Sequence, residues 1–448
     1  MQSIQASQSL RVSLLIMGLL VVLLTGYWSF GKSFGYLGIH PFYIGEAVML
    51  AGLGMILYRS RFYVLKHASF WLYWAFFLVA LLQGGVSVFV LKQPAMEVVR
   101  NLAIVYYGLF AYIVYSLTAY PGMGRAFYQK LIRTIIPRLF PYLLVGSLLT
   151  VTAFNLFDGQ LPLFPGTQVP IVFYKPTDAV MPFFLYFTLA IRGHMHQLYL
   201  MGAMLPILIC SARSRSVMIC FFVASLLTLR PSKRYVRLFA ILAALLAVLA
   251  VSGLRINLGY REVSASQFVA NTLSILNLDD QSAEVDPTAV RNKQWRSEWW
   301  DQIVADALQP DRVAIGLGWG TNLAETFEVM APGVYSDLNA LRHPHNALFG
   351  ILARGGWLAA ALWTCFYASL FWGLWWAKRV FGATDRELGD LAVAIMVYVA
   401  ASLVNGSTDV FLESPQVAIP HWVIIGLGWG LIRLARQQSG ALPKPTDP

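Results

Sequence analysis

Charged side chains are scarce in this sequence. Only 12% of its 448 residues are Asp, Glu, Lys or Arg, whereas 58% are hydrophobic. That balance excludes a large soluble protein and indicates a polytopic membrane protein. The first apolar run, about residues 12–30, has no small-residue cleavage site, so we expect a first transmembrane helix there and not a cleavable signal peptide.

Cysteines and metal-ligand motifs are also scarce. The three cysteines all fall within apolar segments, with neither a disulfide framework nor zinc spacing, and we expect them to be small core residues: Cys210, Cys220 and Cys365. The acidic run at 279–286 lacks metal-site spacing and predicts a solvated loop. We therefore expect no metal and no cofactor.

Long apolar runs make up most of the chain, and about twelve are long enough, or nearly so, to cross a membrane. They lie at residues 12–30, 41–58, 70–91, 99–119, 139–157, 179–192, 197–212, 215–230, 235–253, 346–376, 388–405 and 416–434. The predicted fold is an all-α polytopic membrane protein. We divide it into a first group of nine helices (1–253), an outer loop region (254–345), and three last helices with a tail (346–448).

The distribution of Lys and Arg among the connections predicts the orientation. With the N-terminus inside, the even connections and the tail are basic: Arg59, Arg61, Lys66, Arg125, Lys130, Arg133, Arg138, Arg192, Arg230, Lys233, Arg234, Arg237, Lys378, Arg379, Arg386, Arg433, Arg436 and Lys444. The short odd connections are poor in basic residues, and the last carries Asp409 and Glu413. Both termini are therefore predicted inside and the long loop outside. The net charge of +11 is thus explained by membrane anchoring, without a nucleic-acid partner.

Arg213 and Arg215 break this rule, because they lie in an outer connection. They are either arginines that extend to the interface from a helix end or a paired cationic site for an anionic ligand. Glu46, within the second apolar segment, is either a functional carboxylate or a helix–helix hydrogen-bonding residue. Lys175 and Asp178 are weaker candidates for lining an outer cavity.

The outer loop contains a predicted helix. Asp286 and Pro287 are a plausible N-cap and first position of a helix to about Leu308. Four residues on it share one stripe that faces protein or membrane: Arg291, Trp295, Trp299 and Ile303. A stretch at 268–278 could lie on the membrane surface. The segment 316–320, Gly-Leu-Gly-Trp-Gly, predicts a turn and is a weak phosphate-loop candidate.

The most distinctive motif is the sequence Arg-His-Pro-His-Asn at 342–346, where this polar loop returns to an apolar segment. Ionisable groups are costly beside lipid, so the cluster indicates chemistry. We expect His345 to lie in the first turn of the next helix, where the helix dipole favours a neutral imidazole that can act as a base. His343 is expected to support the site or to neighbour the N-cap. Together with the arginines at 213, 215 and 291, the cluster suits a diphosphate and a base-activated hydroxyl.

These residues resemble the bacterial O-antigen ligase and polymerase superfamily of membrane glycosyltransferases. The most specific match is His345-Asn346, nine residues, then Gly356, although Ala359 departs mildly from the pattern. Three further elements are similar to family motifs: Ser214-Arg215-Ser216, Arg291 with Trp295, and the turn at 316–320. These motifs cover about residues 211–360.

The resemblance implies a C-type membrane glycosyltransferase fold with twelve helices and a periplasmic loop between helices nine and ten. It also implies transfer of a glycan from undecaprenyl diphosphate to lipid A–core at the bacterial inner membrane, with inversion and without a metal. Arg215 and Arg291 would bind the diphosphate, and His345 would activate the acceptor hydroxyl. From their positions, we expect a second set to contact substrate: Arg213, Arg342, His343, Asn346 and Trp295.

Other activities remain open. An O-antigen polymerase or a protein O-oligosaccharyltransferase would carry similar motifs, although the single large outer loop favours a ligase. A polysaccharide transporter or flippase would also be polytopic and basic. No internal repeat and no matched pair of broken helices is evident in the sequence, which disfavours that class.

Overall fold

The computed structural model describes residues 2–229 apart from 40–41, 60–61, 121–122, 158–159, 166–169 and 174, scattered residues between 235 and 275, and residues 287–329 and 342–440. In chain order the elements are α1 (Gln2–Phe30), α2 (Lys32–Gly35), β1 (Gly38–Ile39), β2 (Phe42–Tyr43), α3 (Ile44–Arg59), α4 (Ala68–Phe89), α5 (Ala95–Asn101), α6 (Ala103–Tyr106), α7 (Leu109–Thr118), α8 (Arg125–Lys130), the π-helical turn η1 (Leu131–Ile135), α9 (Ile136–Leu156), α10 (Pro176–Ala179), α11 (Met181–Ile191), α12 (Gln197–Arg213), α13 (Arg215–Thr228), β3 (Ile256–Asn257), β4 (Glu262–Val263), α17 (Pro287–Ala307), α18 (Leu323–Thr326), α19 (Ala347–Gly382), α20 (Arg386–Gly406) and α21 (Pro415–Gln438).

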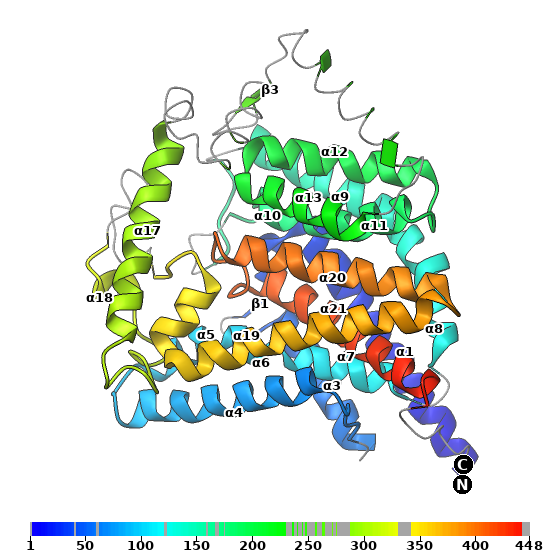
Figure 1. The fold of residues 1–448 in the computed structure, drawn as a ribbon, viewed down its shortest axis with the longest axis horizontal. Coiled ribbons are helices and arrows are strands. Elements are labelled where there is room, and N and C mark those ends of the chain that lie inside the picture. Colours follow the sequence, from blue (N-terminus) through cyan, green and yellow to red (C-terminus); the bar gives the residue numbers. More distant parts are fainter. Residues whose placement is uncertain are drawn as a thin grey trace.

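The described chain is a bundle of helices, and its strands form only two short antiparallel pairs, β1 with β2 and β3 with β4. Helices α4, α19, α20, α12 and α13 run side by side, while α17 lies across one end of the bundle (Figure 1). Helices α20 and α21 are the central ones, since 78% and 89% of their apolar windows are buried. A helix that is apolar all round is expected in such a core position.

Six described helices are long and apolar enough to cross a membrane, and a seventh span is possible if α5 to α7 is one bent span. Four more are apolar but shorter: α3, α10 with α11, α12 and α13. Eleven of the twelve predicted segments therefore coincide with helices, whereas most of 235–253 lies outside the described residues. A multi-pass, mainly helical membrane protein is confirmed; the count of twelve spans stays a prediction.

Two helices are interrupted, which the apolar pattern did not indicate. The fourth predicted segment is broken between α5 and α6, with a bend of 44°. Helix α19 is kinked at Gly356, whose φ of 69° and ψ of −174° lie outside helical values. Both breaks lie near the end of the bundle that α17 covers, where irregular backbone can be satisfied by protein contacts instead of lipid.

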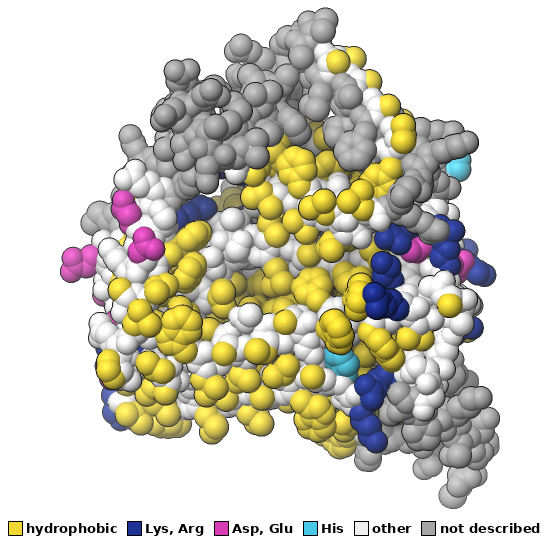
Figure 2. All heavy atoms as spheres, in the orientation of Figure 1, with side chains coloured by type: hydrophobic (Ala, Val, Ile, Leu, Met, Phe, Trp, Pro, Cys, Tyr) yellow, Lys and Arg dark blue, Asp and Glu magenta, His cyan; other side chains and the backbone are white. Residues whose placement is uncertain are grey.

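The two sets of connections separate to opposite ends of the bundle. At one end, three arginines from predicted inner connections pair with acids near the start of α20: Arg125 with Asp385 at 3.1 Å, Arg133 with Glu387 at 2.9 Å, and Arg192 with Asp390 at 2.6 Å. In Figure 2, Lys and Arg side chains gather near this end, and hydrophobic side chains cover the helices between the ends. This separation supports the alternating topology read from the charges.

The outer helix α17 runs from Pro287 to Ala307, so the predicted bounds and first helical position are confirmed. Its residues Trp295, Trp299 and Ile303 form a small core with Leu352 and Ala360 of α19 and with their neighbours. The apolar stripe therefore faces protein. The predicted surface helix at 268–278 lies mostly outside the described residues.

One core prediction is wrong. Cys210 and Cys220 are buried as expected, but Cys365 is exposed on α19. Lipid and the protein interior are both apolar, so the sequence of an apolar helix does not indicate which of its faces points into the protein.

Candidate functional site

The base candidate lies directly before α19, not within it. Asn346 is the N-cap: its Oδ1 accepts hydrogen bonds from the backbone N–H groups of Leu348 at 3.0 Å and Phe349 at 3.2 Å. Its Nδ2 donates to the carbonyl of Ser407 at 3.0 Å. The expectation that His345 occupies the first helical turn is therefore wrong, because His345 precedes the cap with a φ of 52°. The Asn346 side chain thus bonds to the start of α19 and to the loop at 407, and its contact with a substrate stays a prediction.

His345 is held between an acid and an indole. Its Nδ1 lies 3.5 Å from Oδ1 of Asp409, and its ring meets that of Trp295 edge-on, with centroids 6.0 Å apart. The side chain keeps 14% of its surface exposed. Nδ1 makes no hydrogen bond at this distance, but the negative charge beside it favours the tautomer with the hydrogen on Nδ1, which leaves Nε2 as the acceptor that a general base needs.

Asp409 is itself paired with Lys175, whose Nζ lies 2.6 Å from its Oδ2. Burial raises the pKa of Asp409, but Lys175 and His345 outweigh it, and the pKa falls below its ordinary value. The carboxylate is therefore ionised at neutral pH and able to stabilise a positive charge on His345. The last outer connection, noticed in the sequence only as acidic, thus supplies the partner of the base candidate.

A second cluster surrounds Arg354, which is only 2% exposed. Its Nε donates to the carbonyl of Thr321 at 3.3 Å and its Nη2 to that of Arg342 at 3.1 Å. Its Nη2 also lies 3.1 Å from Nδ1 of His343, and its Nη1 lies 4.0 Å from Glu413. One guanidinium thus ties three segments around the motif at 342–346.

Sequence reasoning did not single out Arg354. The signal was available, because an arginine inside an apolar run is costly and is expected to be paired. Glu97 of α5, which pairs with Arg342 at 3.0 Å, was not singled out either. Arg354 had been absorbed into the predicted segment at 346–376, and Glu97 into the short connection before the segment at 99–119.

His343 forms a close pair with Glu413 through its Nδ1. Burial lowers the pKa of His343, and Arg354 lowers it further while Glu413 opposes both. Burial acts to raise the pKa of Glu413, but His343 and Arg354 bring it to about 2. The contacts of the Nδ1 of His343 with Arg354 and Glu413 fit a supporting role for this histidine, and its contact with a substrate stays a prediction.

The glycine-rich segment forms the predicted turn but not a phosphate loop. The N–H groups of Leu317 and Gly318 donate to the carbonyls of Ala353 and Arg354, at 2.7 and 3.1 Å, and that of Trp319 donates to Ser87 Oγ at 2.9 Å. These donors are therefore unavailable to a phosphate. The turn instead packs against the kink of α19, where a Cβ on Gly316 would lie 2.5 Å from the carbonyl of Ala353.

Arg215 is the first residue of α13, directly after the N-cap Ser214, and it is half-buried. A helix N-terminus and a guanidinium together suit an anion. Arg213 and Arg291 lie in α12 and α17, but their side chains fall outside the described part of the structure. The convergence of these arginines on His345 stays a prediction.

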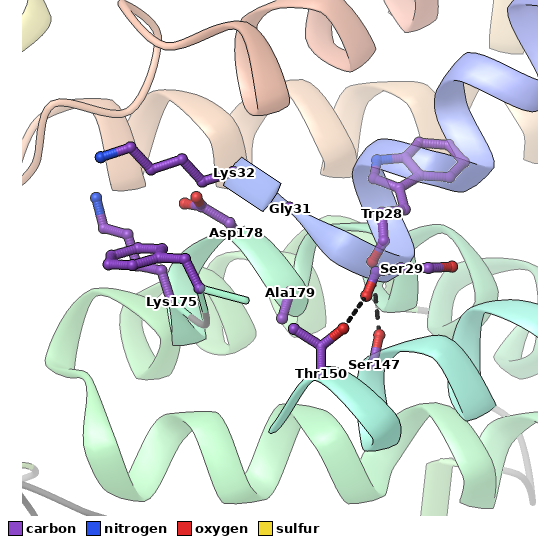
Figure 3. A pocket seen from close by; sticks show the side chains of 10 residues that line it. Trp28, Ser29, Gly31, Lys32, Ser147, Thr150, Lys175, Asp178 and Ala179 are labelled. Atoms are coloured by element: carbon purple, nitrogen blue, oxygen red, sulfur yellow. Dashed lines mark hydrogen bonds between the residues drawn. The ribbon is translucent and has the colours of Figure 1, made fainter. Parts of the chain in front are cut away.

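Lys175 and Asp178 do line a cavity, as predicted from the sequence. Its lining residues come from α1, α2, α9, α10 and the connections next to them: Trp28, Ser29, Gly31, Lys32, Ser147, Thr150, Phe173, Lys175, Asp178 and Ala179. Figure 3 shows Lys32 and Lys175 extending in the same direction, with the Asp178 carboxylate between them. Lys32 had not been recognised, because it directly follows an apolar run as an anchoring lysine would.

Both carboxylate oxygens of Glu46 accept hydrogen bonds from within the protein. The hydroxyl of Tyr107 donates to its Oε1 at 2.6 Å, and the backbone N–H of Tyr43 lies 3.1 Å from its Oε2. Of the two interpretations of this residue, helix–helix hydrogen bonding accounts for its contacts.

Within the described ranges, no three His, Cys, Asp or Glu side chains are grouped as metal ligands would be.

The fold and this site define a class: a multi-pass helical membrane protein with a cluster of basic, acidic and histidine side chains at one end of the bundle. Residues 194–364 match the family model described as O-antigen ligase. Members of this family are glycosyltransferase-like enzymes, ligases or polymerases, that act on lipid-linked sugars. A comparison with curated proteins found no match.

Proposed function

We propose that this protein is an O-antigen ligase of the bacterial inner membrane, which transfers a glycan from undecaprenyl diphosphate to a sugar of lipid A–core on the periplasmic side. The observation that carries the proposal is the Asp409–His345 pair beside Trp295. His345 and Trp295 lie within the residues that match the family model, whereas Asp409 lies beyond them. A base oriented by a carboxylate is what transfer to a hydroxyl requires.

In the proposed reaction, His345 takes the proton of the acceptor hydroxyl while that oxygen attacks the anomeric carbon of the donor. The new carbon–oxygen bond forms on the face opposite the diphosphate, so the configuration inverts. The bond to the diphosphate breaks, and undecaprenyl diphosphate leaves with the electron pair. Asp409 stabilises the imidazolium that His345 becomes, and Lys175 keeps Asp409 ionised.

Arg215 and Arg291 are proposed to bind the diphosphate and the charge that develops on it, with Arg213 as a further contact. Guanidinium groups suit this role because they keep their charge and bind phosphate through two donors. Arg342 is proposed to act more through the loop than on substrate, since Glu97 already pairs with it. Trp295 is proposed to set the position of the His345 ring.

The main test is transfer by His345 variants reconstituted with lipid-linked glycan and lipid A–core. His345→Asn is preferable to alanine alone, because asparagine tolerates the positive φ at this position and preserves the turn. We expect no transfer from either variant while the protein stays folded. Persistent transfer would refute the general-base role.

A deletion strain separates ligase from polymerase. Long glycan accumulating on the carrier lipid supports a ligase, whereas single repeat units on the core indicate a polymerase. Full transfer in the presence of a chelator would support the proposed metal-free chemistry.

A further inference from the structure

The cavity beside Asp409 contains a cation without a matched acid. Lys32 lies over the rings of Phe173 at 5.0 Å and Tyr36 at 5.7 Å, and it has no carboxylate at ion-pair distance among the described residues. Burial lowers the pKa of Lys32, Lys175 lowers it further, and Asp178 opposes both. An anion bound here would relieve that unfavourable environment.

The acids around the cavity are engaged elsewhere. The carboxylate of Asp178 accepts from Nε2 of Gln416 at 3.3 Å and from the hydroxyl of Thr177 at 3.2 Å. Asp409 is engaged with Lys175 at 2.6 Å. On the side of the cavity formed by α1 and α9, the hydroxyl groups of Thr150 and Ser147 donate hydrogen bonds to carbonyls of α1 (Figure 3). Among the described residues, Lys32 is therefore the lysine of this cavity that lacks an ion pair, since Lys175 pairs with Asp409.

The position of the cavity relates it to the base. Lys175 joins the cavity to Asp409, and Asp409 faces His345. Large apolar side chains are exposed on two of the helices that line the cavity, such as Phe30 at 44% on α1 and Leu149 at 60% on α9. A ligand anchored in the bilayer can thus lie along α1 and α9 while its head group reaches the lysines.

We propose that Lys32 and Lys175 bind a phosphate substituent of the acceptor glycolipid and thereby direct its sugar toward His345. This inference rests on the proposed function, and it adds an acceptor site to the arginines proposed for the donor diphosphate. An ammonium is a suitable partner for a monodentate phosphate oxygen. Lys32 is the residue to test, because Lys175 also holds Asp409.

The experiment compares Lys32→Gln, Lys32→Arg and the control Lys92→Gln, an exposed lysine in the connection between α4 and α5. Each purified protein is placed in phosphatidylcholine nanodiscs and assayed with intact and with phosphatase-treated lipid A–core. For Lys32→Gln we expect the KM for intact acceptor to rise about tenfold, as expected for loss of one charged hydrogen bond, with kcat and donor KM unchanged. Lys32→Arg and Lys92→Gln should stay within about twofold of wild type.

The treated acceptor makes the test specific. Removing its phosphates should raise the wild-type KM by about the same tenfold factor and should leave Lys32→Gln unaffected, because the two partners of one contact are not additive. A Lys32→Gln protein that still distinguishes the two acceptors would overturn the proposal. A rise confined to donor KM would also overturn it by making Lys32 part of the diphosphate site.

Two further outcomes are separated in the same assay. If added phosphatidylglycerol, and not acceptor phosphate, changes the effect of Lys32→Gln, the bound anion is a bilayer head group and the acceptor assignment is wrong. If wild-type protein transfers nothing to either acceptor, the proposed function itself fails. That result is distinct from an active wild type with an unaffected Lys32→Gln.

Discussion

Replacing Asp409 by asparagine tests the arrangement around His345 with almost no change in side-chain shape. In the structure, the carboxylate lies 3.5 Å from Nδ1 of His345 and 2.6 Å from Nζ of Lys175. Asparagine removes the charge that would stabilise an imidazolium, while its amide can still occupy the same space. The change therefore probes electrostatics and tautomer, not packing.

The magnitude follows from the distance. At 3.5 Å and an effective dielectric constant of about 20, a full charge pair is worth about 5 kcal/mol. Lys175 shares the carboxylate and the histidine is partly exposed, so the usable stabilisation is smaller. We expect kcat to fall about 100-fold, which corresponds to about 2.7 kcal/mol.

The assay is glycan transfer by purified protein at saturating donor and acceptor, with thermal unfolding in detergent as the check on folding. Asp311→Asn is the matched control, since its carboxylate is 68% exposed and lies in the outer loop region. We expect the control to retain wild-type kcat. Wild-type kcat for Asp409→Asn would refute the reasoning that this carboxylate orients and stabilises His345.

Three further predictions concern the base, the buried acid and the kink. His345→Asn should lose transfer by at least about 100-fold with an unchanged melting temperature, and a proportional loss of both would instead indicate a structural role. Glu413 has a pKa of about 2 when folded against an ordinary 4.5, so its carboxylate stabilises the fold above pH 4.5 and the effect is lost as pH falls toward 2. The loss amounts to about 3 kcal/mol, and Glu413→Gln should flatten the fall in melting temperature over that window; an unchanged slope would contradict the assignment. Gly356→Ala should destabilise the protein by about 2–3 kcal/mol, because its Cβ would lie 2.6 Å from the carbonyl of Val313 at a φ of 69°, whereas Gly382→Ala, with open space around it, should have little effect in the same unfolding assay.

Much of the fold could be predicted from the sequence because lipid imposes a simple rule. A span needs a long apolar run, and the charge of each connection indicates its side. Eleven predicted segments coincide with helices, and α17 begins at the predicted Pro287. The helical stripe of Trp295 and Trp299 faces protein, which is one of the two surroundings that its periodicity allowed.

The helix breaks were less accessible to sequence reasoning. Apolar periodicity averages over a window and does not register a break of one or two residues, such as the one at Leu102 between α5 and α6 or the kink at Gly356. His345 was expected in the first turn of α19 but lies one residue before the N-cap, because a proline two positions before an asparagine cap does not mark the first helical residue. A cap is decided by which side chain reaches the free N–H groups, and that depends on three-dimensional geometry.

The sequence by itself determined that this is a membrane protein of many helices, with its basic connections on one side and a histidine motif on the other. It also carried the residues that match the O-antigen ligase family. Only the tertiary structure decided which side chains meet. Asp409, Lys175 and His345 are separated by up to 234 positions in the chain yet form one contact series. A local sequence pattern indicates whether a segment lies in lipid or in water. The partners of a buried charge depend instead on how segments distant in the sequence pack together.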